Sequence, residues 1–422
     1  MFELRAGEKE IQTAAGRFAE AEVAPRAAEI DRKAKFPRVL VRKMAEQGLF
    51  GIPFPKKYGG AGATLTSYVA AVEELSKASA SVGFLSAAGL ISAFPFLYAG
   101  TEEQKEKFLR PLCLGEKQGA FALTEPSAGS DPLSIKTTAV REGEGGGRGG
   151  GKDEFVLNGR KAFVTNTAVA DIYLVFAQTE KGRKGEEKSG EREKSGVREK
   201  SGVREKRREG GRGGGLSAFV VEKGTKGFSF AKIEELLGMR GCLVGGLTFD
   251  DCRVPAENLL GKEGDGFRIA MATLDRDRIA MSSIGVGVAQ ACLDASKKYA
   301  KERRQFGQPI ANFQAVQFML ADIAVETEAA RLLTYKAASL ADKGDGRKGG
   351  GAEKITKEAA MAKLYASEVA QRAATNAVQI HGGFGCTKDC PAERYFRDAR
   401  VLGIAVGTSE IQRLVIAREV LR

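Results

Sequence analysis

The chain has 422 residues, of which 43% are hydrophobic, and it carries a formal net charge of +12 at pH 7. This length and apolar content can bury a large core, which predicts a globular protein of two or three domains. The opening MFELRAGEKEIQ is charged at once, and no run of 18 uncharged apolar residues occurs. We therefore expect a cytoplasmic protein with no membrane span.

Histidine and cysteine usage excludes several kinds of site. His381 is the only histidine, which excludes HExxH zinc sites, multi-histidine metal sites and any Ser-His-Asp triad not built on it. The six cysteines form no CxxC pair, so we expect free, mostly buried thiols. No metal site is expected, and proton transfer falls mainly to carboxylates, lysines or tyrosines.

Much of the excess positive charge lies in the segment 180–215, which contains 13 Lys or Arg and 8 Asp or Glu. A six-residue EKSGVR-like repeat begins at Glu187, and no aromatic side chain is present on which a nucleic-acid base could stack. This composition is typical of a solvated insertion, so no nucleic-acid partner is expected. We expect 180–215 and the glycine-rich segment 141–152 to be disordered insertions.

The N-terminal part of the chain, to about residue 116, has the periodicity of helices. KFPRVLVRKMAEQGLFGI and SYVAAVEELSKASASVGFLSAAGLISAFPFLYAG carry apolar residues at three- and four-residue spacing, with a glycine-rich loop between them. Thr101 and Gln104 have the spacing of a capping box, which predicts a helix that continues through Phe108.

From about residue 120 to residue 260 the pattern changes to short segments rich in β-branched and aromatic residues, which predicts a small β-barrel or sandwich. After Gly266 the helical period returns, with further helices over about 355–380 and 408–421. GVGVAQ at 285–290 lacks the third glycine of a dinucleotide-binding motif and lies in a helical pattern, which indicates helix packing.

The stretch FALTEPSAGSD at 121–131 combines hydroxyl side chains, a stiff proline turn and a glycine that allows close backbone approach. With KAFVTNTAVADIYLVFA, RRQFGQPIANFQAVQ, QIHGGFG and VGTSEIQRLVIARE, in this order, it resembles the acyl-CoA dehydrogenase family from about residue 5 to residue 420. The resemblance implies an α+β fold with an N-terminal helical domain (1–116), a central β-domain (117–262) and a C-terminal four-helix bundle (263–422). It also implies FAD, an acyl-CoA substrate, electron-transfer flavoprotein as electron acceptor and a homotetramer.

The same resemblance implies two groups of FAD-binding residues. Those expected to line the flavin or to contact FAD beside it are Phe121, Leu123, Thr124, Ser130, Phe163, Thr165, Thr408 and Glu410. Those expected to reach the FAD of a neighbouring subunit, or to surround the adenosine and pyrophosphate, are Arg303, Phe306, Gln314, Gln379, Gly382 and Gly383. Thr165 is expected to hydrogen-bond near N5, the flavin atom that accepts hydride.

The C-terminal GIAVGTSEIQRL departs from part of the family. Medium- and short-chain members carry their catalytic glutamate where this chain has Val406, which cannot accept a proton. Isovaleryl- and long-chain-type members carry it on an earlier helix, at the position of Asp277. Asp277 is therefore the candidate base, although a chain one methylene shorter loses about 1.5 Å of reach. The alternative is a surface carboxylate paired with Arg276, Arg278 or Arg303.

By resemblance, the residues expected to contact the CoA thioester are Ser130, Asp275, Arg278, Val406 and Gly407. The Val406 N–H can still hold the thioester oxygen. These residues predict a dehydrogenase of a short, branched or alicyclic acyl-CoA, nearer to the isovaleryl-CoA-type members. Two alternatives are a base-shifted enzyme that eliminates at other carbons of a cyclic acyl-CoA, and a flavoprotein that binds acyl-CoA without oxidising it.

Overall fold

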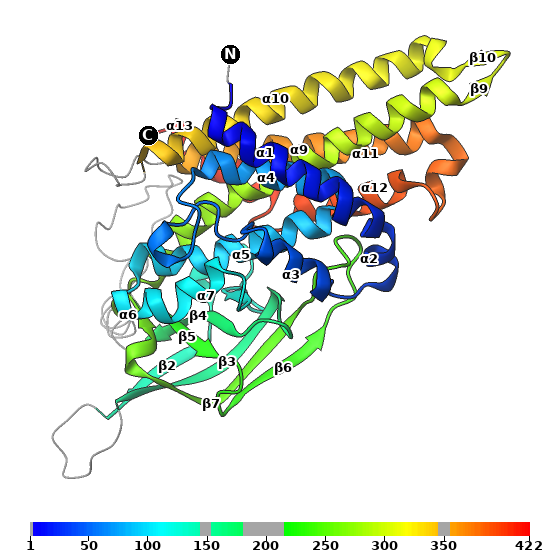
Figure 1. The fold of residues 1–422 in the computed structure, drawn as a ribbon. Coiled ribbons are helices and arrows are strands. Elements are labelled where there is room, and N and C mark those ends of the chain that lie inside the picture. Colours follow the sequence, from blue (N-terminus) through cyan, green and yellow to red (C-terminus); the bar gives the residue numbers. More distant parts are fainter. Residues whose placement is uncertain (1–2, 144–152, 180–214, 345–354) are drawn as a thin grey trace, which may run out of the picture.

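The computed structural model describes residues 3–143, 153–179, 215–344 and 355–422 (Figure 1). The predicted insertions lie outside these ranges except at their ends. Arg141 and Glu142 were expected in the first insertion, but they complete strand β2 (Thr138–Glu142), opposite Phe155 and Glu154. The Arg141 guanidinium is held there by two hydrogen bonds to Asp153, of 2.9 and 2.7 Å.

The N-terminal segment is helical, and its elements follow the predicted apolar periodicity. They are α1 (Ala6–Phe18), α2 (Ala27–Lys33), α3 (Arg38–Glu46), α4 (Leu65–Ala78), α5 (Ala80–Ala99), α6 (Glu102–Gln104) and α7 (Arg110–Cys113). The capping box is confirmed, because Thr101 Oγ1 accepts from Gln104 N (3.2 Å) while Gln104 Oε1 accepts from Thr101 N (3.1 Å). A π-helical stretch, Lys105–Leu109, then joins α6 to α7.

The central segment forms one mixed sheet of eight strands, with the order β6-β7-β3-β2-β4-β5-β8 and β1 paired to β4. Besides β2, the strands are β1 (Gly119–Ala122), β3 (Glu154–Thr165), β4 (Ile172–Thr179), β5 (Leu216–Glu222), β6 (Phe228–Ile233), β7 (Val244–Pro255) and β8 (Leu259–Leu260). Among the described residues the edge strands β6 and β8 do not pair with each other, so the barrel is not closed.

Strand β4 shows why the sheet packs between two cores. Its residues alternate between faces, as a pleated strand requires. Three side chains contact the helical core, namely Ile172, Leu174 and Phe176. The three between them face a second core, which lies within the β-segment: Tyr173, Val175 and Ala177. Figure 1 shows the helices gathered on one side of the sheet.

The C-terminal segment returns to helices, as predicted, and this confirms the α+β fold class. Its elements are α9 (Gly266–Glu302), the hairpin strands β9 (Arg304–Gln305) and β10 (Gln308–Pro309), α10 (Gln314–Gly344), α11 (Thr356–His381), α12 (Pro391–Leu402) and α13 (Ser409–Val420). Helices α9, α10 and α11 run side by side (Figure 1). Of these, α9 packs on α4 and α5, and α10 packs on α4.

Two glycines of the GVGVAQ segment allow helix α9 to approach its neighbours closely. A Cβ at Gly285 would lie 2.8 Å from the Ala366 carbonyl oxygen on α11, and a Cβ at Gly287 would lie 2.5 Å from the Glu73 carbonyl oxygen on α4. Both distances are too short for a carbon atom, so the segment serves helix packing, as predicted.

Two helices are long and apolar enough to cross a membrane by length and composition, namely α5 and α9. In each, 78% of the most apolar window is buried inside the protein, so both behave as core helices. All six cysteines are free, and only Cys386 is exposed, which confirms the prediction of mostly buried thiols.

Candidate active site

The FALTEPSAGSD stretch begins as strand β1 and ends in a tight turn. Glu125 and Ala128 exchange two backbone hydrogen bonds of 3.1 Å, which close the turn. Phe121 packs against Phe176, with 4.9 Å between ring centroids. Ser130 lies exposed beyond the turn. This arrangement leaves the backbone and hydroxyls of the loop accessible at one edge of the sheet.

A buried ion pair holds this loop to strand β3. Lys161 Nζ lies 2.7 Å from Glu125 Oε1 and donates a second hydrogen bond to the Leu123 carbonyl oxygen (3.2 Å). The Glu125 carboxylate also accepts from the backbone N–H groups of Lys136 (2.6 Å) and Thr137 (3.0 Å). Burial opposes the charge on Glu125, but these donors outweigh it and hold the pKa of the carboxyl below its usual range. The pair therefore fixes both ends of the loop.

Phe163 lies in a bulge at the end of strand β3. The register with β7 shifts between Lys161 and Val164, and Phe163 takes a φ of +53°, a left-handed conformation uncommon outside glycine. The residue is 66% exposed, although Lys161 and Val164 beside it in the strand are buried. Ala162 N donates to the Thr124 carbonyl oxygen (2.9 Å), which joins the bulge to the turn. The structure thus places the bulge that carries Phe163 beside Thr124, with Thr165 two residues further along the strand.

A second group of predicted FAD residues lies at the far end of the helical layer. Phe306 is the tip of the β9–β10 hairpin, which projects away from the sheet (Figure 1), and its ring is 92% exposed. Around it lie the other predicted contacts at helix ends, all exposed: Arg303, Gln314, Gln379, Gly382 and Gly383. Within one chain this group does not converge with Phe163 and Thr165.

Asp277 lies in the middle of helix α9 with its side chain inside the protein. The residue is 3% exposed, and its Oδ1 accepts no hydrogen bond from the described residues. Burial raises the pKa of Asp277 to about 8, against the opposing charges of Arg278 and Lys363. The alternative of a surface carboxylate paired with an arginine therefore does not hold.

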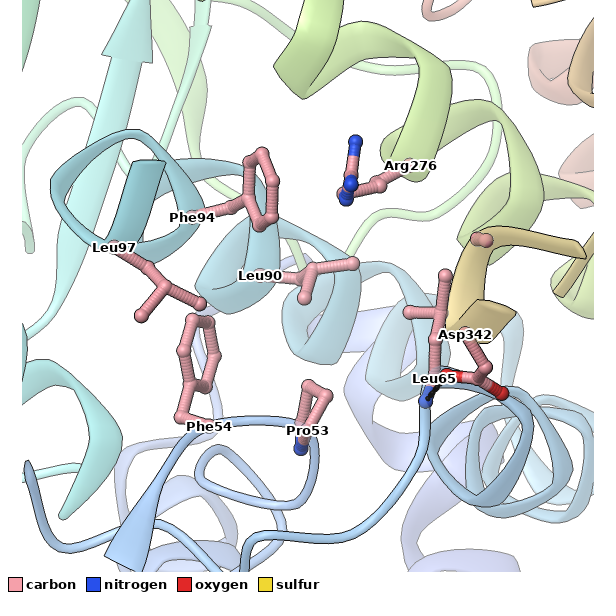
Figure 2. Close-up of a pocket in the computed structure, with 9 residues that line it drawn as sticks. Pro53, Phe54, Leu65, Leu90, Phe94, Leu97, Arg276 and Asp342 are labelled. Atoms are coloured by element: carbon pink, nitrogen blue, oxygen red, sulfur yellow. Dashed lines mark hydrogen bonds between the residues drawn. The ribbon is translucent and has the colours of Figure 1, made fainter. Parts of the chain in front are cut away.

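The neighbouring arginines are engaged elsewhere. Arg278 Nη1 donates to Asp275 Oδ1 (2.6 Å), and Asp275 Oδ2 also accepts from Thr356 Oγ1 (2.7 Å). Figure 2 shows Arg276 over Phe94, with 4.2 Å between the guanidinium carbon and the ring centroid. The cavity beside these two side chains measures about 20 Å³, room for about one water, so it cannot hold an acyl chain.

Val406 and Gly407 form a turn between helices α12 and α13. Both have positive φ, +57° and +87°, and valine rarely adopts this conformation. Gln412 Nε2 donates to the carbonyl oxygens of Val406 (3.2 Å) and Gly407 (2.9 Å), while Lys363 Nζ donates to that of Gly407 (2.7 Å). Thr408 then caps helix α13, with Ile411 N at 3.4 Å from its Oγ1.

Helix α11 brings Asp277 and this turn together, because Lys363 bonds Gly407 and lies close enough to Asp277 for each charge to shift the other's pKa. Glu410 lies one turn further, at a cleft of about 300 Å³ that also includes Arg400 and Arg413. Residue types and spacing did not identify Lys161, Lys363 or Gln412 as residues of the site. For Lys363 a signal was available, because this lysine occupies a position in the alanine-rich, buried face of α11.

Family models match three parts of the chain: the acyl-CoA dehydrogenase N-terminal domain at residues 6–116, the middle domain at 120–193 and the C-terminal domain at 264–421. A relative from Clostridium acetobutylicum, an acyl-CoA dehydrogenase described as short-chain specific, is 45% identical over 408 residues, which is 96% of this chain and 95% of the relative.

This chain belongs to the acyl-CoA dehydrogenase family. The butyryl-CoA dehydrogenase structure from Megasphaera elsdenii matches with a TM-score of 0.88 and 39% identity, covering 100% of both chains. A chain in a structure of the electron transferring flavoprotein of Acidaminococcus fermentans matches with a TM-score of 0.88 and 43% identity, also covering 100% of both chains. The protein is therefore an acyl-CoA dehydrogenase, an oxidoreductase that uses FAD.

The described residues fit FAD. Phe163 presents an exposed ring at a strained backbone position, and a Cβ at Gly129, Gly382 or Gly383 would meet no atom within 4 Å, so a ligand can approach these glycines closely. The amide oxygen of Asn166, which is buried in the segment after Thr165, has no hydrogen-bond partner among the described residues. Throughout the residues that the structure describes, no group of three or more His, Cys, Asp or Glu side chains could hold a metal ion.

Proposed function

We propose that this acyl-CoA dehydrogenase oxidises a short acyl-CoA, including branched or alicyclic ones, to the corresponding enoyl-CoA. Asp277 removes the α-proton of the thioester, and the Val406 N–H polarises the thioester carbonyl. Bound FAD supplies the acceptor for the hydride that leaves the β-carbon, so one C=C bond forms. The names of the relatives, short-chain specific and butyryl-CoA dehydrogenase, support a short acyl chain.

The proposal rests on the burial of the Asp277 carboxyl, which has an oxygen atom without a hydrogen-bond partner among the described residues. A buried carboxylate is costly unless it is paired, and such groups are concentrated at functional sites. Asp277 also lies within electrostatic range of Lys363, which donates to the Gly407 carbonyl oxygen. A pKa of about 8 makes it a strong base for its type, because a general base works best when its pKa lies near the working pH.

The turn supports the second half of the mechanism. The Val406 N–H donates no hydrogen bond within the described part of the chain, and it is partly buried. Such a donor stabilises the negative charge that develops on the thioester oxygen when the α-proton leaves. Asp275 lies two residues before the base on α9, and Arg278 directly follows it. The two are oriented by each other and by Thr356 and are proposed to contact the CoA moiety with Ser130.

Assembly into a homotetramer is proposed from an apolar stripe on helix α10. Phe318, Val325 and Leu332 recur every seven residues and are 62%, 70% and 43% exposed. A continuous stripe of large apolar side chains on one helix face is the pattern of a helix that packs against another protein surface. Assembly would also bring the hairpin group around Arg303 to the FAD of a neighbouring subunit.

Electron-transfer flavoprotein is proposed as the electron acceptor. The similar chain found in the Acidaminococcus fermentans structure supports this choice. We also propose that the enzyme is of the isovaleryl-CoA type, because members of that type carry the catalytic base on the helix that corresponds to α9. We further propose that the protein is cytoplasmic.

Anaerobic mixing with a panel of acyl-CoA thioesters tests the function. The panel contains butyryl-, isovaleryl- and cyclohexanecarboxyl-CoA, and the readout is bleaching of the flavin absorbance together with the position of the new double bond. Bleaching with an α,β-enoyl product supports the proposal. A double bond at another ring carbon would favour the base-shifted alternative, and tight binding without bleaching by any thioester would favour the non-catalytic flavoprotein.

A further inference from the structure

The Val406–Gly407 turn holds a conformation that its own sequence disfavours. Two successive residues have positive φ, and the first is β-branched, for which this region is a genuine outlier. A strained conformation of this kind persists only where surrounding contacts impose it. The contacts that impose it here are therefore part of the site.

Two buried side chains from different helices make these contacts. Lys363 of α11 is 1% exposed and Gln412 of α13 is fully buried. Lys363 Nζ donates to the Gly407 carbonyl oxygen at 2.7 Å, and Gln412 Nε2 donates to the carbonyl oxygens of Gly407 and Val406 at 2.9 and 3.2 Å. The two carbonyls that follow the Val406 N–H in the chain are therefore both anchored.

The residue before Val406 is also anchored. Ala405 N donates to the Val401 carbonyl oxygen in the last turn of α12, at 3.0 Å. The Val406 N–H thus lies between two fixed segments, and within the described residues it is left without an acceptor. A hydrogen-bond donor that cannot rotate is pre-organised for charge that develops at one point.

We propose that Lys363 and Gln412 are positioning residues that hold the Val406 N–H in the direction of the thioester oxygen. The inference rests on the proposed function, since it assigns to these residues the task of setting how strongly the substrate carbonyl is polarised. Lysine suits this task because its long chain spans from α11 to the turn, and its apolar stem packs in the alanine-rich helix face.

The test uses a chromophoric enoyl-CoA, 4-aminocinnamoyl-CoA, whose absorption band moves to longer wavelength when its carbonyl accepts a strong hydrogen bond. Lys363→Met and Gln412→Leu are compared with the wild type as FAD-loaded proteins. We expect each variant to lose about half of the red shift and about 10-fold in the rate of flavin reduction, with little change in KM, because a misdirected donor acts mainly in the transition state. Lys357→Met, at a partly exposed lysine of the same helix, should leave both readouts unchanged.

Lys363→Gln keeps a donor at the same position and should recover part of the red shift. Variants that bind FAD and give the full wild-type red shift would overturn the inference, even if they were less stable. If Lys363→Met does not fold, Gln412→Leu and Lys363→Gln still decide the question, because the first keeps the Lys363 side chain and the second keeps a polar group at that position. Failure of the proposed function is a separate result, since it would appear in the wild type as absence of bleaching by every thioester.

Discussion

Replacing Asp277 by asparagine is expected to make the protein more stable and less active at once. Burial raises the pKa of this carboxyl from 3.8 to about 8 in the folded protein. Between these two values the folded chain keeps a proton that the unfolded chain has lost, so stability falls as pH rises through this window. The cost is about 1.4 kcal/mol for each pH unit above the unfolded value, which gives at most about 4 kcal/mol at pH 7.

An asparagine at this position does not ionise, so it removes the whole of this cost. Its buried amide costs about 1–3 kcal/mol in return, which leaves a net gain of about 2 kcal/mol at pH 7 and a net loss of about 1–3 kcal/mol near pH 4. Thermal unfolding of the FAD-loaded proteins between pH 4.5 and pH 8.5 measures the difference. Asp322→Asn, at an exposed carboxylate of α10, is the matched control and should leave the pH dependence unchanged.

The same variant tests the base. Asp277→Asn should retain FAD and bind acyl-CoA, but flavin reduction should slow by several orders of magnitude because the amide cannot accept the α-proton. In the wild type, the rate should rise with pH up to about 8 as the carboxyl ionises. Asp277→Ala combined with Val406→Glu should restore part of the activity. Normal flavin reduction by Asp277→Asn would refute the assignment, and a stability gain independent of pH would refute the raised pKa.

Three further changes test other parts of the structure. Lys161→Met leaves the buried Glu125 carboxylate without its counter-ion and should cost about 3–5 kcal/mol of folding free energy, with loss of FAD. Adding Glu125→Gln should recover most of both in denaturant titrations, and equal instability of the single and double variants would argue against the pair. Arg303→Glu should weaken FAD retention by about 3 kcal/mol, measured by flavin release, and a fully yellow oligomer would contradict the shared cofactor site. Val325→Asp should give a folded chain that sediments as a smaller species, and an unchanged tetramer would exclude the α10 stripe as an interface.

Periodicity was enough to predict the order of helices, strands and helices, because the apolar pattern reports directly which face of each element is buried. The capping box at Thr101 and the packing role of the GVGVAQ segment also followed from local chemistry. The end of β2 was missed, since Arg141 and Glu142 are polar and precede a glycine run, and only their pairing with β3 makes them strand.

The site was less accessible to sequence reasoning, because it depends on contacts between distant segments. The positive φ of Val406 cannot be read from its residue type, which disfavours that conformation. Lys161 and Glu125 are 36 residues apart, and Lys363 and Gly407 are 44 apart, so no local pattern joins them. The burial of Asp277 likewise depends on helices packed around α9 and not on its arginine-rich surroundings in the sequence.

Helix α9 carries Asp277 in its interior and ends immediately before Arg303, so the two side chains are separated by about 39 Å of one rigid rod at about 1.5 Å per residue. If Arg303 serves the cofactor of a neighbouring subunit, each chain contributes to two reaction centres. Chains carrying only Asp277→Asn and chains carrying only Arg303→Glu would then complement each other. In a mixed pair, one centre would combine the altered residue 277 of one chain with the altered residue 303 of the other. The second centre would combine the intact Asp277 and the intact Arg303, so co-assembled inactive variants should regain up to half of the activity of the intact enzyme.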